Sequence, residues 1–205
     1  MTDKLEATLD ALFLRASDDE TKALAASQQR TNAALHSDIY AYDVLEWRVA
    51  THIWFAVGEK GLAAVQMGSI DESDFLAAQS GRLRGILFRD DSLTQGVRQQ
   101  LREYLEGERR HFDLPIDWRH MSDFQATVLR GALQIPAGEV LSYGELAQKI
   151  GRPKAARAVG RALGTNPMPI IIPCHRVLAS DGSLTGYIGG TAVKAHLLQL
   201  EGYVA

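Results

Sequence analysis

The sequence predicts an α+β fold in two parts, a first unit built around a small antiparallel sheet with helices and a second, mostly helical domain. In the first part, residues 47–68 (WRVATHIWFAVGEKGLAAVQMG) contain two apolar runs separated by GEKG, which is typical of a β-hairpin. After Asp123 the apolar residues recur at helical spacing, and Ser142 with Glu145 forms a Ser-x-x-Glu capping motif. The change of period between these stretches separates the two parts.

The elements of the first part follow from periodicity. The first 45 residues are predicted to be helical, because Leu5, Leu9, Leu12 and Phe13 fall on one helical face. After the hairpin, the stretch from Asp91 to Glu108 has an amphipathic helical pattern. Residues 112–118 are predicted to form a short strand, and their proline favours a sheet edge. We therefore expect a helical extension at 1–45, an α+β unit at 46–118 and a helical domain at 119–205.

The helical domain has a helix-turn-helix pattern. A helix over residues 122–139 is ended by its proline and glycine, and a short helix follows Ser142. The sequence Gly-Arg-Pro at 151–153 predicts a tight turn, and Lys154 to Leu163 predicts a second helix closed by Gly164. The final helix is expected over TAVKAHLLQLE, residues 191–201.

The distribution of charge favours a nucleic-acid partner. The chain carries −3 in total, but residues 139–205 carry +3 and the remainder −6. GRPKAARAVGR, residues 151–161, holds four cations and no acid, and its alanines, together with Ala162, would leave the helix surface smooth. From charge alone, an ordinary solvated face is as good an explanation. The cations are Arg152, Lys154, Arg157 and Arg161.

The composition argues against membrane, secreted, disulfide-bonded and zinc-cluster proteins. No apolar run approaches the roughly 20 residues of a membrane span, and the acidic first residues do not match a signal peptide. A single cysteine, Cys174, excludes an intramolecular disulfide and a cysteine-rich zinc cluster. We expect a cytoplasmic protein without a membrane partner and without a metal.

Cys174 lies in IIIPCHRVLAS, after three isoleucines that suggest a buried strand. A lone cysteine is most often an inert buried residue. Here His175 and Arg176 follow it directly, and a neighbouring base or cation makes a thiol nucleophilic. A glycine-rich loop, DGSLTGYIGG, comes next, and Glu201 is a candidate to orient the histidine.

These residues together resemble the O6-alkylguanine-DNA alkyltransferases. The resemblance is close from about Asp123 to Gly202 and weaker over the α+β unit, which is ribonuclease-H-like in that family. It rests on five blocks in the same order and spacing, one of which contains PCHRV. The blocks are SYGELA, PKAARAVG, TNPMPIIIPCHRV, GYIGG and LLQLEG.

The resemblance implies a chemistry for the cysteine. Cys174 would accept the alkyl group irreversibly, one turnover per chain, with no cofactor. His175 would take the thiol proton through a water, Glu201 would fix the imidazole, and Tyr143 would donate to the departing guanine. Asn166 would tie the recognition helix to the active-site turn.

The resemblance also implies a double-stranded DNA partner, bound through the minor groove and largely independent of sequence. Arg157 would fill the gap left by the flipped base, with Ala156 beside it and the other three cations on the backbone. The protein would be monomeric in solution and would cluster on DNA. The base pocket and its contacts to guanine would be formed by Pro169 and by the backbone of Val177, Tyr187 and Ile188.

Three alternatives stay open at this point. A non-catalytic alkyl-lesion-binding relative would lack the cysteine, which this chain has. A helix-turn-helix transcriptional regulator would leave sequence-specific footprints. A thiol hydrolase using Cys174 and His175 would turn over many times on a small ester.

Overall fold

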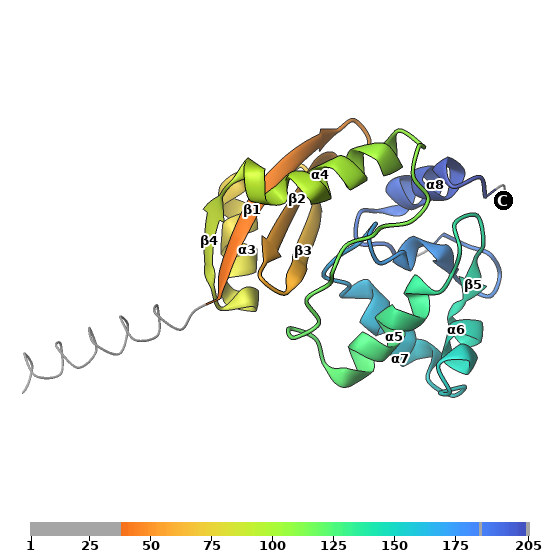
Figure 1. Cartoon of the computed structure of the whole chain (residues 1–205). Helices are drawn as coiled ribbons and strands as arrows, with labels where there is room; N and C mark the ends of the chain where they lie inside the picture. Colours follow the sequence, from red (N-terminus) through yellow and green to blue (C-terminus); the bar gives the residue numbers. More distant parts are fainter. Residues whose placement is uncertain (1–37, 185, 204–205) are drawn as a thin grey trace, which may run out of the picture. The chain divides into compact units, whose positions relative to one another are not determined.

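The computed structural model describes residues 38–184 and 186–203 and confirms the α+β class (Figure 1). The first part consists of β1 (Ile39–Trp47), β2 (Thr51–Gly58), β3 (Gly61–Gly68), α3 (Glu72–Leu83), β4 (Ile86–Arg89) and α4 (Asp91–Leu105). The second part consists of α5 (Asp123–Leu133), β5 (Leu141–Ser142), α6 (Tyr143–Lys149), α7 (Ala156–Gly164), a 3₁₀ turn (Cys174–Arg176), β6 (Val177–Leu178) and α8 (Thr191–Leu200).

The hairpin is confirmed, but the sheet is mixed rather than purely antiparallel. Strand order is β3-β2-β1-β4, and β4 runs parallel to β1. At the hairpin, Gly58 pairs with Gly61. Gly61 has a φ of +112°, and a Cβ there would lie 2.2 Å from the carbonyl oxygen of Pro115, so only glycine fits.

Strand β1 corrects the predicted helical extension. Residues 39–45 belong to the sheet, so the helical prediction for the first 45 residues is wrong over this stretch. Because β1 lies between β2 and β4 and is covered on both faces, Tyr40 to Asp43 are all buried and the strand lacks the usual alternation. The apolar stripe from Leu5 to Phe13 lies outside the described residues.

Two helices cover opposite faces of this sheet (Figure 1). Phe75 and Leu83 of α3 pack with Tyr40 on one face. Val97 and Leu101 of α4 join the other core cluster. Neither α3 nor β4 was predicted, because α3 has a weakly amphipathic sequence and β4 spans only four residues.

The strand predicted at 112–118 is reduced to one isolated bridge, between Leu62 and Ile116. Leu62 donates its N–H to the Pro115 carbonyl at 2.8 Å, and the Asp117 N–H donates to the Leu62 carbonyl at 2.9 Å. Pro115 has no N–H to continue a ladder. The segment therefore runs beside β3 as an extended connection into the second part.

The helices of the second part agree with the predicted pattern, with two differences. Ser142 and Glu145 form the predicted capping box at the start of α6. Helix α7 begins at Ala156, so Lys154 lies in the turn before it and not on the helix. The three isoleucines before the cysteine are buried but form a turn instead of a strand, and Ile170 has a φ of +73°.

No helix among the described residues is long and apolar enough to cross a bilayer.

Candidate active site

Cys174 opens the 3₁₀ turn between α7 and α8, and it is buried, with 6% of its surface exposed. Its Sγ accepts a hydrogen bond from Nδ2 of Asn166 at 3.1 Å. The same amide donates to the Ile172 carbonyl at 2.9 Å and accepts from the Met168 N–H at 3.0 Å. Asn166 therefore links the end of α7 to the cysteine turn and also touches the sulfur.

His175 and Glu201 form a buried pair. Nε2 of His175 lies 3.0 Å from Oε1 of Glu201, and both side chains are fully buried. A carboxylate partner requires the proton on Nε2, which leaves Nδ1 as the acceptor of the neutral ring. Nδ1 is buried and has no hydrogen-bond partner among the described residues. The imidazole thus has one free basic nitrogen.

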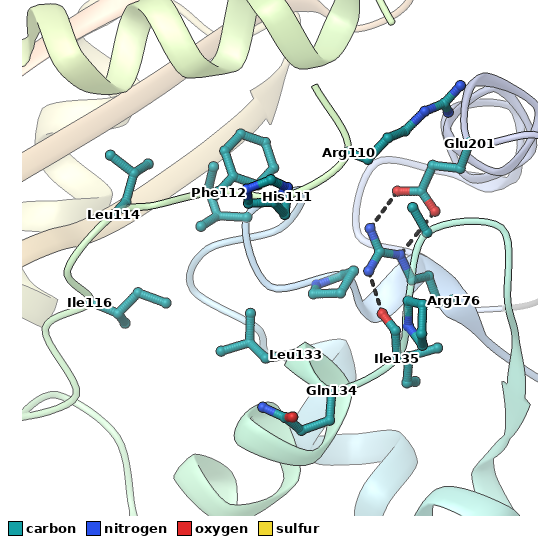
Figure 2. Close-up of a pocket in the computed structure, with 14 residues that line it drawn as sticks. Arg110, His111, Phe112, Leu114, Ile116, Leu133, Gln134, Ile135, Arg176 and Glu201 are labelled. Atoms are coloured by element: carbon teal, nitrogen blue, oxygen red, sulfur yellow. Dashed lines mark hydrogen bonds and ion pairs between the residues drawn. The ribbon is translucent and has the colours of Figure 1, made fainter. Parts of the chain in front are cut away.

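Two further residues hold the carboxylate of Glu201. Arg176 donates from Nε to Oε2 at 2.9 Å and from Nη2 to Oε1 at 2.7 Å, and its Nη1 donates to the carbonyl of Ile135 (Figure 2). Tyr104 of α4 donates its hydroxyl to Oε1 at 2.5 Å. The carboxylate is therefore fixed from three sides, by His175, Arg176 and Tyr104.

Burial and these contacts set the protonation states. Burial would raise the pKa of Glu201, but hydrogen bonds from His175, Arg176 and Tyr104 outweigh it and lower the pKa to about 2. Burial lowers the pKa of His175 against the opposing effect of Glu201. Burial raises the pKa of the Cys174 thiol, opposed by Asn166 and by the nearby charge of Lys194. At neutral pH the carboxylate is ionised, and the imidazole and thiol are neutral.

Tyr143 lies close to the thiol. It is the first residue of α6, and burial followed by the charge of Cys174 raises its pKa. A Cβ added at Gly160 of α7 would lie 3.7 Å from the tyrosine ring, and one at Gly186 would lie 3.7 Å from its hydroxyl. The ring of Tyr143 thus lies against α7, and its hydroxyl lies near the glycine-rich loop.

The four predicted pocket residues differ in exposure. Pro169 and Val177 are buried, whereas Ile188 is 54% exposed. The Val177 N–H donates to the Cys174 carbonyl, and the Val177 carbonyl accepts from Lys194 at 2.7 Å, so this backbone already has partners. The ring of Tyr187 meets that of His175 edge-on at 6.3 Å, and its buried hydroxyl has no partner among the described residues.

A cavity of about 720 Å³ lies beside the same turn (Figure 2). Pro173, Arg176 and Glu201 line it, but Cys174 and His175 do not. The thiol therefore does not open into this cavity. Within residues 38–184 and 186–203, no three His, Cys, Asp or Glu side chains are grouped to hold a metal ion.

The four predicted cations lie on one exposed stretch. Arg152 and Lys154 are in the turn, and Arg157 and Arg161 are on α7. In the described part of the chain, none of the four forms an ion pair, so all four charges face solvent. Of the small residues expected on this surface, Ala156 is partly exposed, but Ala162 packs in the core because it follows Val159 on the inner face of α7.

Sequence reasoning missed two residues of the site, Tyr104 and Lys194. Tyr104 falls on the apolar face of the helical pattern at residues 91–108, and its partner lies 97 positions away in the chain. Lys194 lies in a helix that would ordinarily expose it, yet it is 1% exposed. The signal for Tyr104 is weak but present, because a tyrosine on a buried helix face needs a partner for its hydroxyl.

Sequence models of two domains match this chain. The 6-O-methylguanine DNA methyltransferase ribonuclease-like domain matches residues 41–118, and the DNA-binding domain of the same family matches residues 123–203.

Individual relatives agree with these matches. The methylated-DNA–protein-cysteine methyltransferase of Methanosarcina barkeri is 38% identical over 161 residues, which cover 78% of this chain and 96% of that protein. The Mycobacterium tuberculosis protein of the same name is 51% identical over 112 residues, 55% of this chain and 67% of that protein. A crystal structure of M. tuberculosis O6-methylguanine methyltransferase superposes with a TM-score of 0.68 at 38% identity, covering 79% of this chain and 92% of that one. A structure of the M. tuberculosis protein in complex with DNA gives the same score.

Proposed function

Because this chain belongs to the 6-O-methylguanine DNA methyltransferase family, we propose that Cys174 is the residue that takes the alkyl group from O6 of guanine in DNA. The activity is repair of the alkylated base by transfer to a protein cysteine. The observation that carries the assignment of Cys174 is its position beside a buried His–Glu pair. It is also the only cysteine of the chain.

The proton of the thiol leaves toward His175. Since the Cys174 thiol is neutral at rest, it becomes nucleophilic only when the proton is removed. Nδ1 of His175 is the free basic nitrogen, and a water between it and Sγ would carry the proton. The imidazolium that forms is stabilised by Glu201 at 3.0 Å, while Asn166 and Lys194 stabilise the thiolate.

The transfer itself is a displacement at carbon. A bond forms between Sγ and the alkyl carbon, and the bond from that carbon to O6 breaks. The electron pair of the broken bond stays on guanine, and Tyr143 donates a hydrogen bond to the departing ring. The product is a thioether, and no second cysteine in the chain could displace it. Each chain therefore reacts once.

The helix-turn-helix domain, residues 119–205, both binds the DNA and carries the reactive cysteine. An O6-alkyl group lies within the base stack, so the nucleotide must be turned out, at a cost of roughly a few kcal/mol. Arg157 is exposed on α7 and would fill the gap. Binding through the minor groove, where the base-pair pattern is degenerate, would make recognition independent of sequence. We expect a monomer in solution that clusters on DNA.

The test is intact-mass analysis after mixing the protein with a duplex that carries one O6-methylguanine, followed by peptide mapping. The expected result is one added methyl group per chain, on Cys174. The Cys174→Ala variant should gain no mass yet still bind the duplex, because the thiol accepts the methyl group whereas α7 binds the DNA. Binding of the lesion without mass gain in the wild type would instead indicate a lesion-binding protein. Repeated turnover on a small ester would indicate a hydrolase.

A further inference from the structure

The most unusual contact of the site comes from outside the domain that carries the cysteine. Tyr104 lies on α4, which packs on the sheet of the first part, yet its hydroxyl reaches Glu201 at the end of α8. Tyr104 is 1% exposed, and its ring packs against Phe112 at 5.0 Å between centroids. The hydroxyl therefore has a fixed place, 2.5 Å from Oε1 of Glu201.

The same hydroxyl also faces the histidine. Its oxygen lies 3.5 Å from Nε2 of His175, at the limit of a hydrogen bond. Because the hydroxyl proton is donated to Glu201, the oxygen can only accept from the ring. Nε2 thus has two acceptors near it, Glu201 Oε1 and Tyr104 Oη, whereas Nδ1 has no partner among the described residues. Both contacts favour the tautomer with its proton on Nε2.

The geometry points to Tyr104 as a positioning residue of the alkyl transfer, which holds Glu201 so that the imidazole keeps Nδ1 free for the thiol proton. This inference rests on the proposed function of Cys174, His175 and Glu201. It gives the first part of the chain a direct role in the chemistry of the second. Arg176 donates to both carboxylate oxygens of Glu201, and Tyr104 donates to Oε1, the oxygen that accepts from His175.

The test compares Tyr104→Phe with the wild type in the full chain. The change removes one oxygen and leaves the ring in place. Single-turnover transfer from O6-methylguanine in a duplex should be slower by about tenfold, since a hydrogen bond to a charged group is lost. The affinity for the same duplex should not change, because Tyr104 is 1% exposed and has no surface to offer to DNA.

Two matched variants separate positioning from stability. Tyr42→Phe removes a similar tyrosine–glutamate bond, of 2.9 Å to Glu72, and should leave the transfer rate unchanged. Val97→Ala loosens the packing of α4 without touching Glu201, and it should lower the melting temperature but not the transfer rate. If Val97→Ala slows transfer as much as Tyr104→Phe, the role of Tyr104 is only structural and the inference is overturned.

The pH profile and the imidazole spectrum give readouts that packing alone would not move. Without the tyrosine donor, the charge of Glu201 acts more strongly on the ring, so the acid limb of the rate profile should shift to higher pH. Nitrogen NMR of labelled histidine should show the Nε2–H signal shifted in Tyr104→Phe, because the carboxylate that accepts this proton has lost one of its donors. The groups that face His175 are Cys174, Arg176, Tyr104, Tyr187, Lys194 and Glu201.

The outcomes distinguish the two proposals. If the wild type is not methylated on Cys174, the proposed function fails. If the wild type is methylated and Tyr104→Phe matches it in rate, pH profile and imidazole NMR signal, the proposed function stands and the role of Tyr104 is refuted.

Discussion

The charge of Glu201 should contribute to stability as well as to chemistry, and Glu201→Gln measures both. A pKa lowered from 4.5 to about 2 corresponds to about 3 kcal/mol of stabilisation of the folded state at neutral pH. Glutamine keeps the size but places an amide against the donors of Arg176. We expect Glu201→Gln to lower the free energy of unfolding by about 3 kcal/mol at pH 7. Transfer should also slow, because His175 loses its charged partner.

The stability loss should depend on pH in one direction. Because the folded-state pKa of Glu201 lies below the unfolded value, its contribution is fully present above pH 4.5 and is lost as the pH falls through about 2. At pH 3 only about 1 kcal/mol of it should remain. The gap between wild type and variant should therefore narrow on acidification.

The assay is urea unfolding followed by tryptophan fluorescence at pH 7 and pH 3. The control is Glu72→Gln, since Glu72 also accepts from a tyrosine, Tyr42, and pairs with an arginine, Arg89. Its side chain is 44% exposed, so the change in stability should be less than about 1 kcal/mol. A loss in Glu201→Gln that is equally large at both pH values would refute the electrostatic explanation. So would a variant as stable as the wild type at pH 7.

Three further predictions concern DNA and the thiol. Arg157→Ala should slow repair in duplex DNA more than reaction with a free base analogue, since only the duplex requires base flipping. Arg102→Ala, which removes an exposed arginine on α4, is the control. Equal slowing with both substrates would show that Arg157 does not fill the gap left by the flipped base. If three or four of the exposed cations contact phosphates, the logarithm of the DNA-binding constant should fall with the logarithm of the salt concentration, with a slope of roughly −3 to −4. A flat response would show that these cations do not bind the DNA backbone. Asn166→Ala should raise the pKa of the Cys174 thiol further, because a hydrogen-bond donor to Sγ is lost. Alkylation of this single cysteine by iodoacetamide near pH 8 should therefore be slower. Unchanged kinetics would show that the 3.1 Å contact does not affect the thiol pKa.

Local signals in the sequence predicted the elements that depend on local chemistry. The hairpin follows from two apolar runs around GEKG, and α6 follows from the Ser142–Glu145 capping box. Strand β1 was missed because it is buried on both faces, and a strand in that position has no alternation to detect. Parallel pairing of β4 with β1 depends on a distant partner, which no local pattern of a four-residue strand can specify.

The residues of the candidate site likewise fall into those that the sequence could identify and those that only the fold brings together. Cys174 and His175 are adjacent in the chain, so their chemistry could be proposed from the sequence. Tyr104 and Lys194 reach the site only through tertiary packing, and their residue types are common in helices of any function. The partner of Tyr104 becomes visible only when α4 and the end of α8 are brought together. Such contacts are properties of the fold and not of a motif.

The left-handed backbone at Ile170 ties the cysteine turn to the packing around it. A β-branched residue at a φ of +73° costs of order 1–3 kcal/mol, so residues 170–172 would not adopt this turn by local preference. The surrounding structure must impose it, through the buried isoleucines and the bonds from Asn166 to Ile172 and Met168. This turn is thus held by tertiary contacts, not by its own sequence. The placement of Cys174 beside Asn166 and the His175–Glu201 pair therefore exists only in the folded chain, and any mutation that loosens this core should disturb it.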